Sequence, residues 1–130
     1  MRLLIITLIA TFFVAQDASA CQKLNPFYLD PEVILLKTHR AQGAKVIDAR
    51  AIRSGDYKRF YFVQYEIAHP KFGTVYPTFA MNKPFQMGSV IYSMDKTAIS
   101  LSGYGDGRRT KARFSAHDSG YNEVTGCLKR

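Results

Sequence analysis

The sequence predicts an α+β domain in which one N-terminal helix packs on a curved antiparallel sheet, or on a small partly open β-barrel, of about six strands. Two observations lead to this prediction. Residues 29–43 carry helix-start and helix-stop signals in the right order. After residue 43 the hydrophobic pattern changes to a period of two, and short alternating segments separated by turn residues continue almost to the end of the chain.

The first twenty residues are expected to be a cleaved secretory signal peptide that is not part of the fold. Arg2 gives a basic start, residues 3–15 form an apolar run, and residues 18–20 read Ala-Ser-Ala, an A-x-A cleavage site. The run is shorter than the roughly 20 residues that a membrane-spanning helix requires. We therefore expect residues 21–130 to form a single globular domain that is periplasmic or secreted, with no transmembrane segment.

The two cysteines, Cys21 and Cys127, are predicted to form a disulfide. Their number allows a single intramolecular pairing, and an exported protein enters an oxidising compartment. The alternative is lipidation of Cys21, because lipoprotein signals also place a cysteine at the cleavage site. Such signals normally carry a large aliphatic residue where this chain has Ala18, and lipidation would leave the Cys127 thiol unpaired.

Residues 29–43 are predicted to form the N-terminal helix. Asp30 suits the N-cap position, and Pro31 suits the first helical position. Basic residues near the other end meet the negative end of the helix dipole, and Gly43 can end the helix. The apolar run at residues 33–36 supplies the buried side, although that run alone also fits a strand.

The first predicted strand, residues 45–53, places Ile47, Ala49 and Ala51 on one face and charged side chains on the other. The remaining strands are bounded by turn signals, and Pro77 places part of one of them at a sheet edge. Residues 69–73, His-Pro-Lys-Phe-Gly, are interpreted as a hairpin connection. The further strands are predicted at residues 57–69, 73–82, 89–94, 97–104 and 109–116.

A glycine-rich segment, residues 102–107, precedes a cluster of cations. A phosphate-binding loop would continue into a helix and end in Gly-Lys-Ser or Gly-Lys-Thr, and neither pattern follows here. We interpret the glycines as a hairpin loop leading into the strand at 109–116, in which alternate residues face the same side. The predicted anion-binding site is this cationic strand face with its loop neighbour: Arg108, Arg109, Lys111 and Arg113. The alternative is that these charges protect an exposed edge strand from aggregation.

The charge balance indicates an acidic partner. The chain has 18 Lys and Arg residues against 10 Asp and Glu, a net charge of +8. A surplus of this size favours association with an acidic protein or with an anionic polymer, either a cell-envelope component or nucleic acid. It argues against an inhibitor of a basic enzyme, because like charges repel at encounter.

Motifs for catalysis or for a metal are weak. The three histidines, His39, His69 and His117, match no metal-ligand spacing, so neither a metal nor a cofactor is predicted. Residues 93–96 match S-x-x-K by letter only, and residues 117–119 read as a turn.

The leading hypothesis is a small exported basic binding protein, more plausibly without catalytic activity, that docks its partner through the cationic strand face. One alternative is a small secreted ribonuclease, whose acid–base pair would be Glu66 with His117, or His39 with His69, and whose cations would hold the phosphate. A second alternative is an envelope structural component anchored by a lipid on Cys21.

Eight tyrosines and the absence of tryptophan also bear on ligands. Tyr61 and Tyr65 are expected to share a strand face, with Tyr76 across the hairpin. Aromatic side chains in a basic setting suit single-stranded bases, but filling a β-sheet core is the preferred interpretation.

Overall fold

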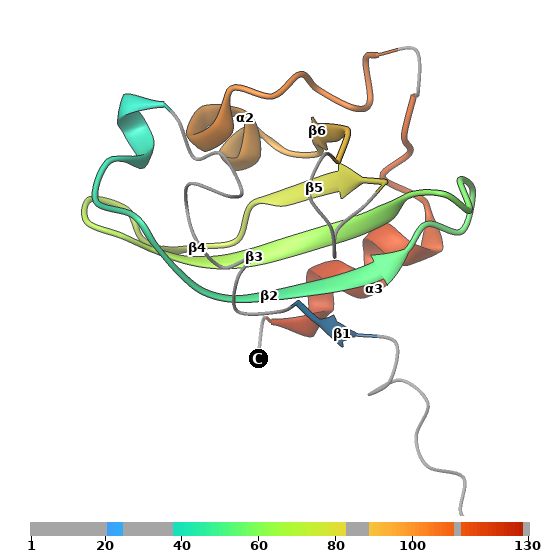
Figure 1. Cartoon of the computed structure of the whole chain (residues 1–130), viewed down its shortest axis with the longest axis horizontal. Coiled ribbons are helices and arrows are strands. Elements are labelled where there is room, and N and C mark those ends of the chain that lie inside the picture. Colours follow the sequence, from blue (N-terminus) through green and yellow to red (C-terminus); the bar gives the residue numbers. More distant parts are fainter. Residues whose placement is uncertain (1–20, 25–37, 83–88, 111–112, 129–130) are drawn as a thin grey trace, which may run out of the picture.

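The structure is a computed structural model, and it describes residues 21–24, 38–82, 89–110 and 113–128 (Figure 1). Residues 1–20, and with them the expected signal peptide, lie outside this part of the chain. The described elements are β1 (Gln22–Lys23), the 3₁₀ helix η2 (His39–Ala41), β2 (Lys45–Arg53), β3 (Tyr61–His69), β4 (Gly73–Val75), β5 (Thr78–Met81), β6 (Ile91–Ser93), α2 (Lys96–Ser102) and α3 (Ser119–Cys127).

The strands form one open antiparallel sheet in the order β1-β2-β3-β5-β6, with β4 also paired to β3. The α+β class and the six-stranded antiparallel sheet are thus confirmed. The β2–β3 ladder has an irregularity between Val46 and Asp48. Because of it, Ile47 does not join Ala49 and Ala51 in the core, and its side chain is 55 % exposed.

The predicted strand at 73–82 is divided in two. Both β4 and β5 pair with β3, and Tyr76 and Pro77 lie between them. Proline has no N–H to donate, so the strand is interrupted at that point. The hairpin connection predicted at residues 69–73 is confirmed by the pairing of His69 with Gly73.

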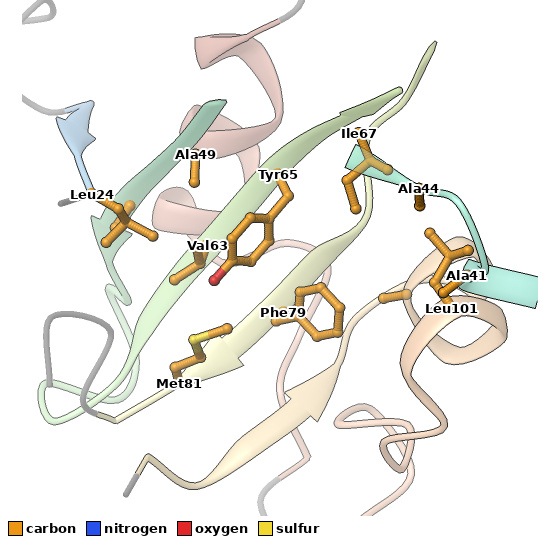
Figure 2. Packing of buried hydrophobic residues seen from close by; sticks show 12 residues of the cluster. Leu24, Ala41, Ala44, Ala49, Val63, Tyr65, Ile67, Phe79, Met81 and Leu101 are labelled. Atoms are coloured by element: carbon orange, nitrogen blue, oxygen red, sulfur yellow. The ribbon is translucent and has the colours of Figure 1, made fainter. Parts of the chain in front are cut away.

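Both faces of the sheet are covered by a hydrophobic cluster. Alternate residues of β3 point to opposite sides, so this strand contributes to both clusters. On one face Val63, Tyr65 and Ile67 pack with Phe79 and with Leu101 of α2 (Figure 2). On the other face a second cluster combines sheet residues with Val124 of α3; its buried members are Ile52, Phe62, Ala80, Met94, Phe114 and Val124. The helices α2 and α3 therefore lie on opposite sides of the sheet (Figure 1).

The helix that packs on β2 and β3 is C-terminal, not N-terminal as predicted. Most of the helix predicted at 29–43 falls outside the described residues. Its described end is the short η2, followed by Gly43 with a φ of 80°.

The strand predicted at 97–104 is wrong, because this segment forms α2. Asp95 is the N-cap, and its carboxylate accepts a hydrogen bond of 2.8 Å from the Ala98 N–H. Gly103 ends the helix with a φ of 76°, in the left-handed region that glycine adopts without a steric penalty.

The strand predicted at 109–116 is also wrong where the structure describes it. Residues 109–110 and 113–116 form turns and irregular backbone. The glycine segment does not form a hairpin loop either, since Asp106 bridges Ser93 of β6 in parallel. Gly107 packs tightly at this point: a Cβ there would lie 3.0 to 3.1 Å from the side chains of Tyr92, Met94 and Phe114. The Gly107 N–H donates to the Ser93 carbonyl at 2.8 Å, and the Gly107 carbonyl accepts from the Phe114 N–H at 2.9 Å.

The predicted disulfide between Cys21 and Cys127 is confirmed. It joins the residue before β1 to the last residue of α3, 106 positions along the chain, with a Cα–Cα distance of 6.0 Å. The pairing is compatible with an extracellular or periplasmic location. Because it uses the sulfur of Cys21, it also excludes a thioether lipid on that residue in the same molecule.

Candidate functional site

Three of the four predicted anion-binding cations, Arg108, Arg109 and Arg113, lie in the described residues, and none of these three is in a strand. Arg108 and Arg109 both approach one carboxylate, that of Asp106, with their Nε atoms 3.3 and 3.9 Å from its oxygens. Arg113 is exposed, with a φ of 47°, and Lys111 lies outside the described residues. The alternation on which this site was predicted is therefore wrong, while anion binding by these residues stays a prediction.

The ionised form of the Asp106 carboxylate is stabilised by Arg108 and Arg109. Burial opposes ionisation, but hydrogen bonds from the backbone and side chain of Arg108, with the charges of Arg108 and Arg109, outweigh it and lower the pKa of Asp106. Two of the four predicted cations are thus partly neutralised within the protein.

Glu66 and His117, one of the two acid–base pairs considered for ribonuclease chemistry, are not brought together. Glu66 lies toward the end of β3 and accepts a hydrogen bond from the Tyr76 hydroxyl at 3.4 Å. His117 is exposed beside Asp118, which binds Ser54 and Gly55 at the opposite end of the β2–β3 hairpin. The side chain of His39 is outside the described structure.

Two of the three tyrosines considered for base stacking, Tyr61 and Tyr65, are used in packing, as the preferred interpretation stated. Tyr65 is buried in the cluster of Figure 2, where burial raises its pKa. Tyr61 packs against the same cluster, and its hydroxyl accepts a hydrogen bond of 2.7 Å from Arg53, whose guanidinium also lies over the ring.

His69 organises the tip of the β3–β4 hairpin. Its Nδ1 accepts hydrogen bonds from the backbone N–H groups of Lys71 at 3.0 Å and Phe72 at 3.2 Å. Two donors at Nδ1 require the neutral tautomer with the proton on Nε2, which donates to the Arg40 carbonyl. The imidazole therefore ties the hairpin tip to η2, and it is buried.

At the end of the sheet where the β3–β4 hairpin tip lies, η2 packs against α2 (Figure 1). The Thr38 hydroxyl contacts the carbonyl oxygens of Ser100 and Leu101 at 2.7 and 2.9 Å. Arg40 donates from Nη1 to the Ser100 hydroxyl at 3.2 Å. The hairpin tip, η2 and α2 thus form one connected surface.

Two adjoining hollows lie on this surface, with volumes of about 620 and 330 Å³. They share Arg40 and Phe72 on their boundary. We call them together the hairpin groove, which is lined by Arg40, Gln42, His69, Pro70, Lys71, Phe72, Val75, Lys96, Thr97, Ser100 and Leu101.

The hairpin groove is positively charged. Arg40, Lys71 and Lys96 are exposed there, and none of the ion pairs between described residues includes them. The described residues that line the groove include no Asp or Glu. Within the described lining, no carboxylate competes with a ligand for these three cations.

Sequence reasoning missed this site because its cations come from three separate segments. Lys71 lay in a stretch that was interpreted only as a hairpin connection, and Lys96 lay in a predicted turn. A dense local run such as residues 108–113 is visible in a sequence, whereas a cluster built by folding is not.

A third hollow, of about 480 Å³, continues the groove beyond Lys96 and Thr97. It is less suited to an anion. Its lining includes Asp95, and its second cation, Arg108, is already paired with Asp106.

Two kinds of feature are absent from the part of the chain that the structure describes. It contains no group of three or more His, Cys, Asp or Glu side chains placed to hold a metal ion. None of its helices has both the length and the apolar character needed to cross a membrane.

Comparison of the chain with protein-family models, with curated proteins and with solved structures finds no match.

Proposed function

We propose that the protein is a small exported binding protein that docks an anionic partner through the hairpin groove. The observation that carries the proposal is the set of three exposed cations, Arg40, Lys71 and Lys96, around two hollows whose described lining contains no carboxylate. An anion placed there meets no carboxylate among the described lining residues, and the net charge of +8 steers it toward the protein.

The rigidity of the groove supports docking. His69 fixes the hairpin tip through both ring nitrogens, and Arg40 is held through its backbone carbonyl and its guanidinium. A preformed site loses less conformational entropy on binding than a mobile one.

The test is the affinity of the purified disulfide-bonded protein for two polyanions without aromatic groups, polyphosphate and polyglutamate. Each is titrated at low and at high ionic strength. We expect binding of at least one of them to weaken strongly with salt, because salt screens exposed charges. The variants Lys71→Glu and Lys96→Glu should each weaken binding roughly ten-fold, since they place like charge against the ligand.

Two controls locate the effect. Arg59→Glu makes the same charge change in the exposed β2–β3 turn, at the other end of β3, and should leave binding nearly unchanged. Arg108→Glu with Arg109→Glu tests the site predicted from the sequence. Affinity insensitive to salt, or equal losses in the groove and in the Arg59 control, would contradict docking through the hairpin groove.

A further inference from the structure

We propose that the anionic partner of the hairpin groove is single-stranded nucleic acid, with one base stacked on Phe72 and the neighbouring phosphates bound by Arg40, Lys71 and Lys96. The inference rests on the proposed function and adds to it the class of ligand. It is based on Phe72, the aromatic side chain shared by the two hollows. Binding of an anion by charge alone would not require an aromatic ring at this position.

Phe72 has the properties of a stacking platform. The residue is 65 % exposed, more than any other large hydrophobic residue in the described part of the chain. One face of the ring lies on the His69 imidazole, with ring centroids 4.6 Å apart and an interplanar angle of 29°. Because His69 is itself fixed at both nitrogens, the Phe72 ring is held in place while the rest of it faces solvent.

The cations lie on both sides of this ring along the groove. Phe72 is on the boundary of the two hollows; Lys71 lines the larger one, Lys96 lines the smaller one, and Arg40 lines both. Proteins that bind single strands combine a cationic groove for the backbone with an aromatic ring for a base. A polyanion without planar groups would use the cations and leave Phe72 in water.

The lining also predicts weak sequence preference. Arg and Lys side chains bind phosphates without regard to the base, and any base can stack on a phenyl ring. Gln42 is the groove residue whose amide can both donate to and accept from a base edge.

The experiment measures fluorescence anisotropy of a labelled oligothymidylate of about 12 nucleotides, a length within the usual range of single-strand sites. An abasic strand of the same length carries the same phosphates without bases. We expect the oligothymidylate to bind the wild-type protein more tightly than the abasic strand does. If three phosphates are neutralised, the logarithm of the affinity should fall with that of salt with a slope of roughly −2.

Two variants isolate the ring. Phe72→Leu removes the planar surface but keeps an apolar side chain, and should weaken oligothymidylate binding roughly ten-fold without changing abasic-strand binding. Phe72→Trp enlarges the platform and should retain or tighten binding. Circular dichroism confirms that both variants are folded, which is expected at so exposed a position.

The outcomes separate this inference from the proposed function. Equal affinity for the two strands, or no effect of Phe72→Leu, overturns base stacking while leaving a groove that binds anions. Polyglutamate binding more tightly than oligothymidylate also overturns it, and indicates an acidic polypeptide as the partner. If Lys71→Glu binds every tested polyanion as tightly as the wild-type protein does, the proposed function itself is wrong.

Discussion

Asp95 and Asp118 each cap the N-terminus of a helix, yet their surroundings move their pKa values in opposite directions. Burial dominates at Asp95, where backbone N–H groups of Ala98 and Thr78 only partly offset it, and the pKa is raised. Burial also opposes ionisation of Asp118, but four donors outweigh it and the pKa is lowered. These donors are the Ser54 hydroxyl and the N–H groups of Gly55, Asp56 and Gly120.

Replacing the two caps should therefore have unequal effects on stability. In Asp118→Asn the new amide group faces the Ser54 hydroxyl and the Asp56 N–H, so two hydrogen bonds to a charged acceptor are lost. We expect the free energy of unfolding to fall by about 3 kcal/mol. Asp95→Asn loses one such bond and removes a charge that burial disfavours, so its cost should be about 1 kcal/mol or less. Denaturant unfolding at neutral pH measures both, and equal losses would contradict this account.

The same caps predict the pH dependence of stability. Because the folded-state pKa of Asp118 is lowered, its contribution is complete above the unfolded-state value of about 3.9 and is lost as the pH falls below it. The folded-state pKa of Asp95 is raised, so ionisation of Asp95 reduces the stability of the folded protein as the pH rises above about 3.9. Unfolding measured from acidic to neutral pH should show a smaller acid loss in Asp118→Asn than in the wild type. An unchanged acid loss in that variant would show that Asp118 is not responsible.

Two glycines of α3 form a matched pair for testing how the helix packs. A Cβ on Gly120 would overlap the carbonyl oxygen of Arg53, a backbone atom of β2. Gly126 has no atom within 4 Å of the position of such a Cβ. Gly120→Ala should destabilise the protein by about 2–3 kcal/mol through overpacking. Gly126→Ala should stabilise it by about 0.5–1 kcal/mol through helix propensity. The melting temperatures of the two variants should move in opposite directions, and a shift in the same direction would argue against this contact.

The disulfide should make a large contribution to stability, because it closes a loop of 106 positions. For a loop of this size the chain-entropy argument gives about 4–5 kcal/mol. The double variant Cys21→Ser with Cys127→Ser should therefore lose that amount in denaturant unfolding, and reductant should no longer affect it. A loss below about 1 kcal/mol would mean that α3 and β1 stay together without the covalent link.

The sheet could be predicted from the sequence, because its central strands carry a local pattern. Residues 45–53 alternate, residues 63–67 alternate within the second strand, and glycine and proline mark the hairpin between His69 and Gly73. The two helices were missed because their local signals conflict. In α2 the β-branched Thr97 and Ile99 favour a strand, while Asp95 and Gly103 are a helix cap at each end.

In α3 the N-cap Asp118 was visible in the sequence, but two glycines within nine residues lower helix propensity. Gly120 is explained only by the close approach of Arg53, a contact between distant segments. The hairpin groove has the same origin: Arg40, Lys71 and Lys96 come together only when η2, the hairpin and α2 have folded. Periodicity could not show this, since each segment contributes a single cation to the groove.

The proposed binding of an anionic partner in the hairpin groove can be located residue by residue. It is tested most directly by mapping chemical-shift changes of backbone amides in a ¹⁵N-labelled sample titrated with a polyanion. We expect the largest changes at Arg40, Lys71, Phe72 and Lys96. Changes concentrated instead at Arg108, Arg109 and Arg113, with the hairpin tip unaffected, would contradict it.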